Sequence, residues 1–147
     1  MTMPEHIKNR VAELFCTQKL GVVATHNHGQ PYTSLMAFAA SEDLRYIYFV
    51  TRAESRKFNN ISQDARIALL VDNRSNQVTD FEEALAVTVT GTVHTLDKND
   101  VSARVFLNKH PYLHDFLHDP QGMFLGMCIK TLYIVSQFES VIEVNVD

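Results

Sequence analysis

A strict alternation of apolar and polar residues over 84–96 constrains the fold more than any other feature of the chain. The valines lie on one face of an extended segment, and the threonines and a histidine lie on the other: Val87, Val89 and Val93 against Thr88, Thr90, Thr92 and His94. A period of two residues is that of a β-strand with one face in a core. The chain is therefore expected to contain a sheet with a buried face.

Further short apolar segments, separated by turn residues, repeat this signal along the chain. Strands are expected over 21–25, 31–40, 45–52, 66–71, 84–96, 123–137 and 140–146. Residues 26–29 read as a hairpin turn, residues 41–43 as a polar bend and residues 72–83 as a polar loop. Strands joined mostly by hairpins favour an antiparallel barrel over a parallel sheet with crossover helices. The periodicity leaves open whether that barrel is closed or split.

Few helices are expected beside these strands. They are predicted over 4–19, 55–61 and 97–109, with a shorter helical turn from Pro111. The first has apolar residues at helical spacing, namely Ile7, Val11, Leu14 and Phe15. Ser55 and Asp97 are the residues expected to cap the other two. The sequence thus predicts a mainly β protein, a β-barrel with a few short helices.

No repeat, low-complexity tract or Pro/Gly-rich linker divides the 147 residues, so a single domain over 1–147 is expected. No apolar run approaches the roughly eighteen residues of a membrane span. Glu5 and Glu13 interrupt the segment in which a signal peptide needs an apolar stretch. We therefore expect a cytoplasmic protein with no membrane association. Cys16 and Cys128 are expected to be small core residues.

Positive charge is concentrated over 45–66. This segment has five basic and two acidic residues, a net charge of +3, whereas the chain as a whole carries −4 and the remainder therefore −7. The basic residues are Arg45, Arg52, Arg56, Lys57 and Arg66. A small cationic region on an anionic protein suits one small anion and argues against a nucleic-acid partner.

The helix that starts at Ser55 is where this anion is expected to bind. Helix N-termini favour acidic side chains because their free N–H groups carry partial positive charge, yet Arg56 and Lys57 occupy the first turn. An anion between them removes this conflict, and the Ser55 hydroxyl and Arg52 add further contacts. The segment therefore predicts a phosphate site. The alternative is that Arg56 and Lys57 are solvated residues whose stems cover apolar neighbours.

Several short segments occur in an order that supports the phosphate interpretation. They are Gly21-Val22-Val23-Ala24-Thr25, Gly29-Gln30-Pro31, Phe49-Val50-Thr51 followed by Ser55-Arg56-Lys57, Asn60-Ile61, Arg66 to Val71, and Val87 to Gly91. In this order and spacing the chain resembles the pyridoxamine 5′-phosphate oxidase-like family of FMN-binding split β-barrels. The resemblance is good from about Leu14 to Leu96 and loose elsewhere.

The resemblance implies a cofactor, an assembly and a set of contacts. Arg56 and Lys57 correspond to the pair that holds the FMN phosphate in the family. Val50 and Thr51 correspond to residues against the flavin, and the strand segment Ser34, Leu35, Met36 and Ala37 to residues along its isoalloxazine ring. Family members are homodimers with the flavin at the subunit interface, so the same arrangement is expected here.

The chain also departs from the vitamin B6 oxidase of this family. That enzyme grips its substrate phosphate around an Arg-Pro step, where this chain has His110-Pro111 flanked by Phe106 and His114. A flavin-contacting Gln of that enzyme is replaced by Leu85 or Ala86. Activity as the B6 oxidase itself is therefore not expected, and no catalytic residue is assigned.

The histidines at positions 110, 114 and 118 have a spacing that places side chains on one helical face, which is a possible metal-site pattern. A solvated amphipathic turn explains the same residues, because Pro111 favours the first helical turn and leaves His110 at the cap. No metal site is predicted.

The leading functional hypothesis is an FMN-dependent oxidoreductase that acts on a small substrate. The alternatives are a flavin-binding protein that relays electrons without a substrate pocket, and a haem-binding split-barrel relative. Replacement of FMN by haem or by a deazaflavin is left open.

Overall fold

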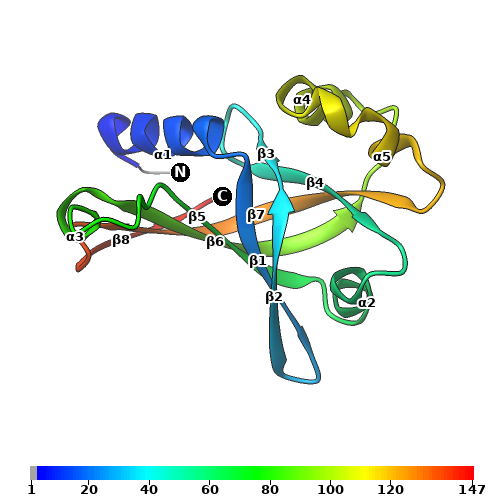
Figure 1. Cartoon of the computed structure of the whole chain (residues 1–147), viewed down its shortest axis with the longest axis horizontal. Coiled ribbons are helices and arrows are strands. Elements are labelled where there is room, and N and C mark those ends of the chain that lie inside the picture. The colour runs from blue at the N-terminus through cyan, green and yellow to red at the C-terminus, as the bar shows by residue number, and fades with distance from the viewer. Residues whose placement is uncertain (1–2) are drawn as a thin grey trace.

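Eight strands form one antiparallel sheet in the computed structural model, which describes residues 3–147 (Figure 1). The strands are β1 Leu20–Asn27, β2 Gln30–Ala37, β3 Ala39–Ala40, β4 Tyr46–Arg52, β5 Arg66–Asp72, β6 Leu85–Thr95, β7 Gly122–Ser136 and β8 Ser140–Asn145. Their order across the sheet is β2-β1-β5-β6-β7-β4-β3, and β8 pairs with β7. Every strand position predicted from the sequence is occupied by a strand.

The two ends of this sheet are neighbours in the chain, and this makes the sheet curl. β2 and β3 stand at opposite ends of the strand order, yet only Phe38 separates them in sequence. The sheet must therefore bend round until its ends meet, and β2 comes to lie against β4 without pairing with it through backbone hydrogen bonds. The result is a split antiparallel barrel, the form that the family resemblance implies and that the periodicity alone leaves open. The strand expected over 31–40 is interrupted at Phe38, a fully buried residue that links β2 to β3 at the bend.

The helices pack around the sheet. They are α1 Glu5–Thr17, α2 Arg56–Gln63, α3 Asp80–Glu83, α4 Val101–Lys109 and α5 His114–His118, with a 3-10 turn at Pro111–Leu113 before α5. None of the helices within residues 3–147 has the length and apolarity needed to cross a bilayer.

Two sequence expectations about helices need correction. Asp100, not Asp97, caps α4, because its carboxylate accepts a hydrogen bond from the Ser102 N–H at 2.9 Å. The Asp97 carboxylate accepts from the Asn99 N–H at 2.8 Å and forms a turn before the helix. The segment 72–83, expected to be a loop throughout, ends in the short helix α3.

The main core lies between α1 and the concave face of the sheet. α1 contributes Ile7, Val11, Leu14 and Phe15, and β6 contributes the alternating valines at 87, 89 and 93. A smaller core beneath α4 and α5 contains Val50, Phe106 and Phe124. Cys16 does not join either core, because it lies on the exposed side of α1. Cys128 is half-buried.

α2 connects β4 to β5 and packs beside the β1–β2 hairpin at one end of the barrel (Figure 1). Ile61 anchors the helix in the main core. The buried side chain of Asn60 adds a polar anchor, since its Nδ2 donates to the Thr25 Oγ1 on β1 at 3.0 Å. These contacts hold the first turn of α2 opposite the hairpin.

Candidate functional site

The first turn of α2 is fixed by Ser55. Its hydroxyl oxygen accepts a hydrogen bond from the Phe58 N–H at 3.1 Å, as an N-cap does. A second hydroxyl, that of Thr51 at the end of β4, lies 2.9 Å from the Ser55 Oγ. The predicted cap is thus confirmed. Helix geometry leaves the N–H groups of the first turn without intrahelical acceptors, and Ser55 satisfies the one at Phe58.

Three cations surround this helix start, and none of them forms an ion pair within residues 3–147. Arg52 ends β4, while Arg56 and Lys57 occupy the first turn of α2, which contains no acidic residue. Burial lowers the pKa of the Lys57 ammonium below its ordinary value of 10.5, because the charged form loses solvation. An anion at this position would restore the lost stabilisation of that charge.

The other two cations of segment 45–66 are already paired. Arg66 lies 2.7 Å from the Asp64 carboxylate, and Arg45 lies 4.0 Å from that of Asp43. The arginine at position 66 also holds the pKa of the Asp64 carboxyl well below its usual range. The unneutralised charge of this segment is therefore concentrated at the start of α2.

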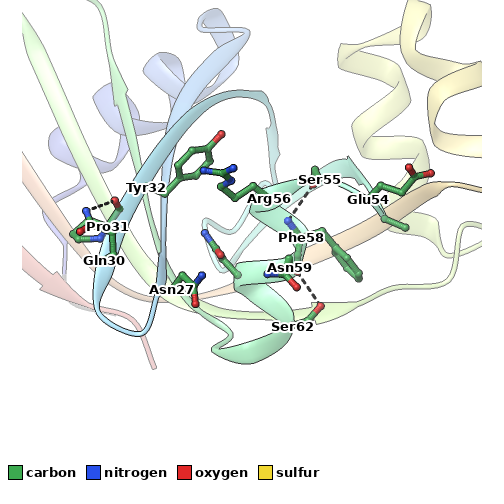
Figure 2. A pocket seen from close by; sticks show the side chains of 12 residues that line it. Asn27, Gln30, Pro31, Tyr32, Glu54, Ser55, Arg56, Phe58, Asn59 and Ser62 are labelled. Carbon is green, nitrogen blue, oxygen red and sulfur yellow. Dashed lines mark hydrogen bonds between the residues drawn. The ribbon is translucent and has the colours of Figure 1, made fainter.

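A cavity of about 950 Å³ opens between α2 and the β1–β2 hairpin (Figure 2). One wall is formed by Asn27, Gln30, Pro31 and Tyr32 of the hairpin, and the other by residues of segment 53–62. The Arg56 guanidinium extends to the Tyr32 ring, with its Cζ atom 5.5 Å from the ring centroid. This contact bridges the two walls and is a favourable cation–π geometry.

Two buried polar atoms lack a hydrogen-bond partner within residues 3–147. They are the Asn60 Oδ1, on a side chain that is 1% exposed, and the Ser34 Oγ on β2. Asn60 also lines the cavity. A buried polar atom without a partner costs free energy, typically about 1–3 kcal/mol. Such atoms therefore mark places where a bound molecule would gain hydrogen bonds.

The structure brings together only some of the residues singled out from the sequence. Ser55 and Arg56 line the cavity, Thr51 contacts Ser55, and Lys57 follows in the same turn. Val50 is buried in the smaller core beneath α4 and α5.

The predicted segment on β2 lies outside the cavity lining, and its side chains alternate between two environments. Leu35 is 67% exposed on the outer face, whereas Met36 is buried in the main core. Ser34 and Ala37 are half-buried. Met36 can therefore meet a ligand only through its backbone.

Sequence reasoning missed the hairpin wall of the cavity. Asn27, Gln30 and Tyr32 belong to a segment that the sequence identifies only as a turn and the start of a strand. Their position opposite α2 results from the pairing of β1 with both β2 and β5. No local sequence signal carries that information.

The three histidines of the possible metal pattern do not converge. His110 is fully buried at the end of α4, where its Nε2 lies 2.7 Å from the Phe38 carbonyl oxygen, and burial lowers its pKa. The ring centroids of His114 and His118 lie 4.3 Å apart on the exposed side of α5, with the rings tilted by 30°. His110 therefore has a structural role at the Phe38 bend.

Comparison with known proteins supports the fold. No curated protein matches this sequence. The haem-binding protein from Mycobacterium smegmatis superposes with a TM-score of 0.81 at 12% identity, over 99% of this chain and 60% of that one. This chain thus spans about 60% of the length of that protein.

Two further solved structures have lengths closer to this chain. General Stress Protein 26 from Bacillus anthracis gives a TM-score of 0.70 at 16% identity, covering 96% of this chain and 99% of that one. An FAD-binding protein from Mesorhizobium loti gives 0.65 at 16% identity, covering 86% and 90%. At these identities the similarity establishes the fold alone.

The family model of pyridoxamine 5′-phosphate oxidase matches residues 7–125 of the chain. This span includes the curled sheet up to the first residues of β7, the Ser55 cap and both walls of the cavity. With a split barrel and a family match over most of its length, the chain belongs to the pyridoxamine 5′-phosphate oxidase family.

Proposed function

We propose that this protein binds FMN through its 5′-phosphate at the start of α2 and acts as an oxidoreductase on a small substrate. The observation that carries the proposal is the group of three cations at a capped helix N-terminus without carboxylate partners in residues 3–147. A phosphate there receives charge-assisted hydrogen bonds and interacts favourably with the helix dipole.

The residues present fit such a phosphate. The first-turn N–H groups of α2 and the Ser55 hydroxyl supply directional donors, and Arg56 and Lys57 supply charge. The half-buried position of Lys57 favours an ion pair over a fully solvated ammonium. By the family resemblance, Val50, Thr51 and the segment 34–37 lie against the ring.

A bound flavin would supply hydride and one-electron chemistry. The residues of this chain would hold the phosphate and orient the ring, and we assign none of them as an acid or base. His110 is fully buried and bonded to the Phe38 carbonyl oxygen, so it is not available to grip a substrate phosphate. This supports a substrate different from that of the B6 oxidase.

Two alternatives remain as second candidates. A flavoprotein that only relays electrons would share the phosphate site but lack turnover with a small substrate. Haem binding is favoured by the fold shared with the Mycobacterium smegmatis haem-binding protein. However, the described cavity lining contains no histidine, cysteine or methionine to serve as an axial ligand. We therefore favour flavin.

The proposal is tested by the double substitution Arg56→Ala and Lys57→Ala. We expect wild-type protein to bind FMN more tightly than riboflavin, and the variant to lose about 1–3 kcal/mol of FMN affinity for each charged contact. Fluorescence quenching measures both ligands, and thermal unfolding measures the apo-protein. Without ligand, the variant should be as stable as the wild-type apo-protein or slightly more so, because the substitutions remove two positive charges from the positive end of the helix dipole.

The matched control is the pair Lys8→Ala and Arg10→Ala on α1, which removes the same charge from a helix away from the cavity. Equal affinity of wild type for FMN and riboflavin would contradict the phosphate site. Unfolding of the apo-variant would instead indicate that Arg56 and Lys57 are structural. Turnover with a reduced nicotinamide donor and small acceptors distinguishes the enzyme from the electron relay.

A further inference from the structure

A cavity of about 700 Å³ lies between the end of α1 and α4. Both helices pack against β3, and Figure 1 shows them on the same side of the sheet with β3 between them. None of the residues that line this cavity lines the one beside α2. Its volume is that of a site for a small organic molecule. The cavity is therefore a candidate site for a ligand other than the flavin.

Much of the lining of this cavity is apolar. Phe15 and Leu44 line it with side chains that belong to the main core. Three alanines, at positions 12, 39 and 40, add short side chains that occupy little of the space. A hydrocarbon or aromatic group gains free energy when it leaves water for such a surface. The lining thus suits a ligand with an apolar body.

The Lys109 side chain brings a positive charge into this apolar lining. Its Nζ atom donates to the carbonyl oxygens of Phe15 and Gln18 at 2.6 and 2.7 Å. The same atom lies 3.9 Å from the centroid of the Phe38 ring. These contacts fix the position of the ammonium at the end of α1. Because an ammonium has three N–H groups, the two carbonyl oxygens leave one for a further acceptor.

The charge of Lys109 is not neutralised by an acidic side chain. No carboxylate within residues 3–147 forms an ion pair with it or with Lys19, the other lysine of the lining. Burial lowers the pKa of the Lys109 ammonium to about 8, because the charged form loses solvation. The acidic residue among the described lining residues is Glu42, and its side chain is exposed. The cavity therefore combines a partly desolvated cation with an apolar surface.

We propose that the cavity between α1 and α4 binds a small carboxylate with an aromatic or aliphatic body. The carboxylate accepts a hydrogen bond from the Lys109 Nζ and interacts with the charge of Lys19, while the apolar body packs against Phe15 and Leu44. A carboxylate, with one charge and two oxygens, matches these donors better than a phosphate, which has three acceptor oxygens and up to about two charges. This site goes beyond the proposed function and does not depend on it.

The test uses 3-phenylpropanoate and octanoate, each compared with its uncharged amide by calorimetric titration into the purified full chain. At least one acid is expected to bind roughly fivefold or more tightly than its amide, because only the acid forms a charge-assisted hydrogen bond with Lys109. The affinity should be the same with and without saturating FMN, because the two cavities share no lining residue.

Cys16 reports where the acid binds, since this exposed residue lines the cavity. The bound acid should slow the alkylation of Cys16 by iodoacetamide. The half-buried Cys128 lies outside the lining and is the internal control, so its alkylation rate should not change. Mass spectrometry of peptides measures both rates in one sample.

Two substitutions test the charge requirement. Val105→Glu adds a carboxylate to the lining and should weaken binding of the acid by roughly tenfold through repulsion, with little effect on the amide. The matched control is Val101→Glu, at an exposed valine one turn earlier on α4 and outside the lining, which should leave both affinities unchanged. Lys109→Met should remove the preference for the acid in protein whose thermal unfolding shows that it remains folded.

Several outcomes would overturn this inference. They are the absence of binding by either acid at about 1 mM, equal binding of acid and amide, unchanged acid affinity in Val105→Glu, and binding that leaves Cys16 alkylation unchanged. Competition with FMN would assign the acid to the flavin site and would also overturn it. Failure of wild-type protein to bind FMN, with the acid still bound, would instead contradict only the proposed function.

Discussion

Lys57 is the residue whose environment says most about a ligand. Its ammonium is half-buried, has no ion pair within residues 3–147, and has its pKa lowered from 10.5 by burial. Arg56, its neighbour in the same turn, is exposed and lies over Tyr32. The two adjacent cations therefore have different environments in the protein without ligand. The Arg56 guanidinium contacts an aromatic ring, whereas the Lys57 ammonium has lost part of its solvation and would regain stabilisation from a bound anion.

This environment predicts a pH dependence of cofactor binding. A bound phosphate raises the lowered pKa of Lys57, so FMN binding takes up a proton at pH values between the lowered apo pKa and the raised pKa of the complex. FMN affinity should therefore fall as pH rises through that window. The folding stability of the apo-protein should instead rise with pH between the lowered pKa of folded Lys57 and 10.5, because the unfolded chain binds the Lys57 proton more tightly than the folded chain in that window.

Riboflavin provides the ligand control, since it shares the ring and lacks the phosphate. The riboflavin affinity should not show this fall with pH. In the Lys57→Met variant, the plot of FMN affinity against pH should run parallel to that of riboflavin. Titrations monitored by flavin fluorescence between about pH 7 and pH 10 cover the window below the ordinary lysine pKa. If the affinities of wild-type protein for FMN and riboflavin change with pH in the same way, Lys57 does not contact the phosphate.

At the scale of elements, the irregularity in the pairing of β6 with β7 shapes the barrel. The register shifts between Thr90 and Gly91, so that Thr90 pairs with Thr131 and Gly91 with Ile129. Lys130 is the additional residue of this bulge. A Cβ atom on Gly91 would lie only 2.1 Å from the Cys128 carbonyl oxygen. Glycine is thus required here by the close approach of the two backbones.

Gly91→Ala should therefore destabilise the protein by about 1–3 kcal/mol, near the upper end because the contact is with backbone. Urea unfolding followed by circular dichroism measures this change. Gly29→Asn is the control: this residue has a φ of +85° at the hairpin tip and open space around it. Asparagine tolerates that conformation, so the loss should be small. Similar stabilities of the two variants would show that the bulge can relax.

At the scale of the whole molecule, the outer face of the β1–β2 hairpin is apolar. Leu20 and Leu35 are 53% and 67% exposed, and the register places Ala37 opposite Leu20 and Val22 opposite Leu35. All four side chains therefore share one face. The surface is a candidate for the homodimer contact that the family resemblance implies, with the flavin between subunits.

Light scattering should accordingly report a mass of twice the chain's 16.7 kDa. Leu35→Glu should shift the protein toward the monomer and weaken FMN binding, because a charge cannot be buried in an apolar contact without a large cost. Val78→Glu, an exposed apolar position in the 72–83 segment, is the control and should change neither property. A dimer that persists in Leu35→Glu with full flavin affinity would place the interface elsewhere.

Local patterns in the sequence determined the strand character of β6, the amphipathic face of α1 and the Ser55 cap with two cations in the first turn of α2. Each of these depends on residues within a few positions of one another, through a period of two, a period of 3.6 or one hydrogen bond to the third helical N–H. The cap of α4 was misplaced because Asp97 and Asp100 offer the same local chemistry, and packing selects between them.

The tertiary structure alone decided which distant segments meet. The strand order brings Asn27, Gln30 and Tyr32 opposite α2 and buries His110 against Phe38. Among the described residues 3–147 it leaves Arg52, Arg56 and Lys57 without an ion pair, while Arg66 is neutralised by Asp64. These contacts arise because a sheet whose end strands are joined by one residue must curl, and side chains far apart in sequence then share one cavity. The helix start was visible as a cationic turn in the sequence; the space beside it exists only in the folded barrel.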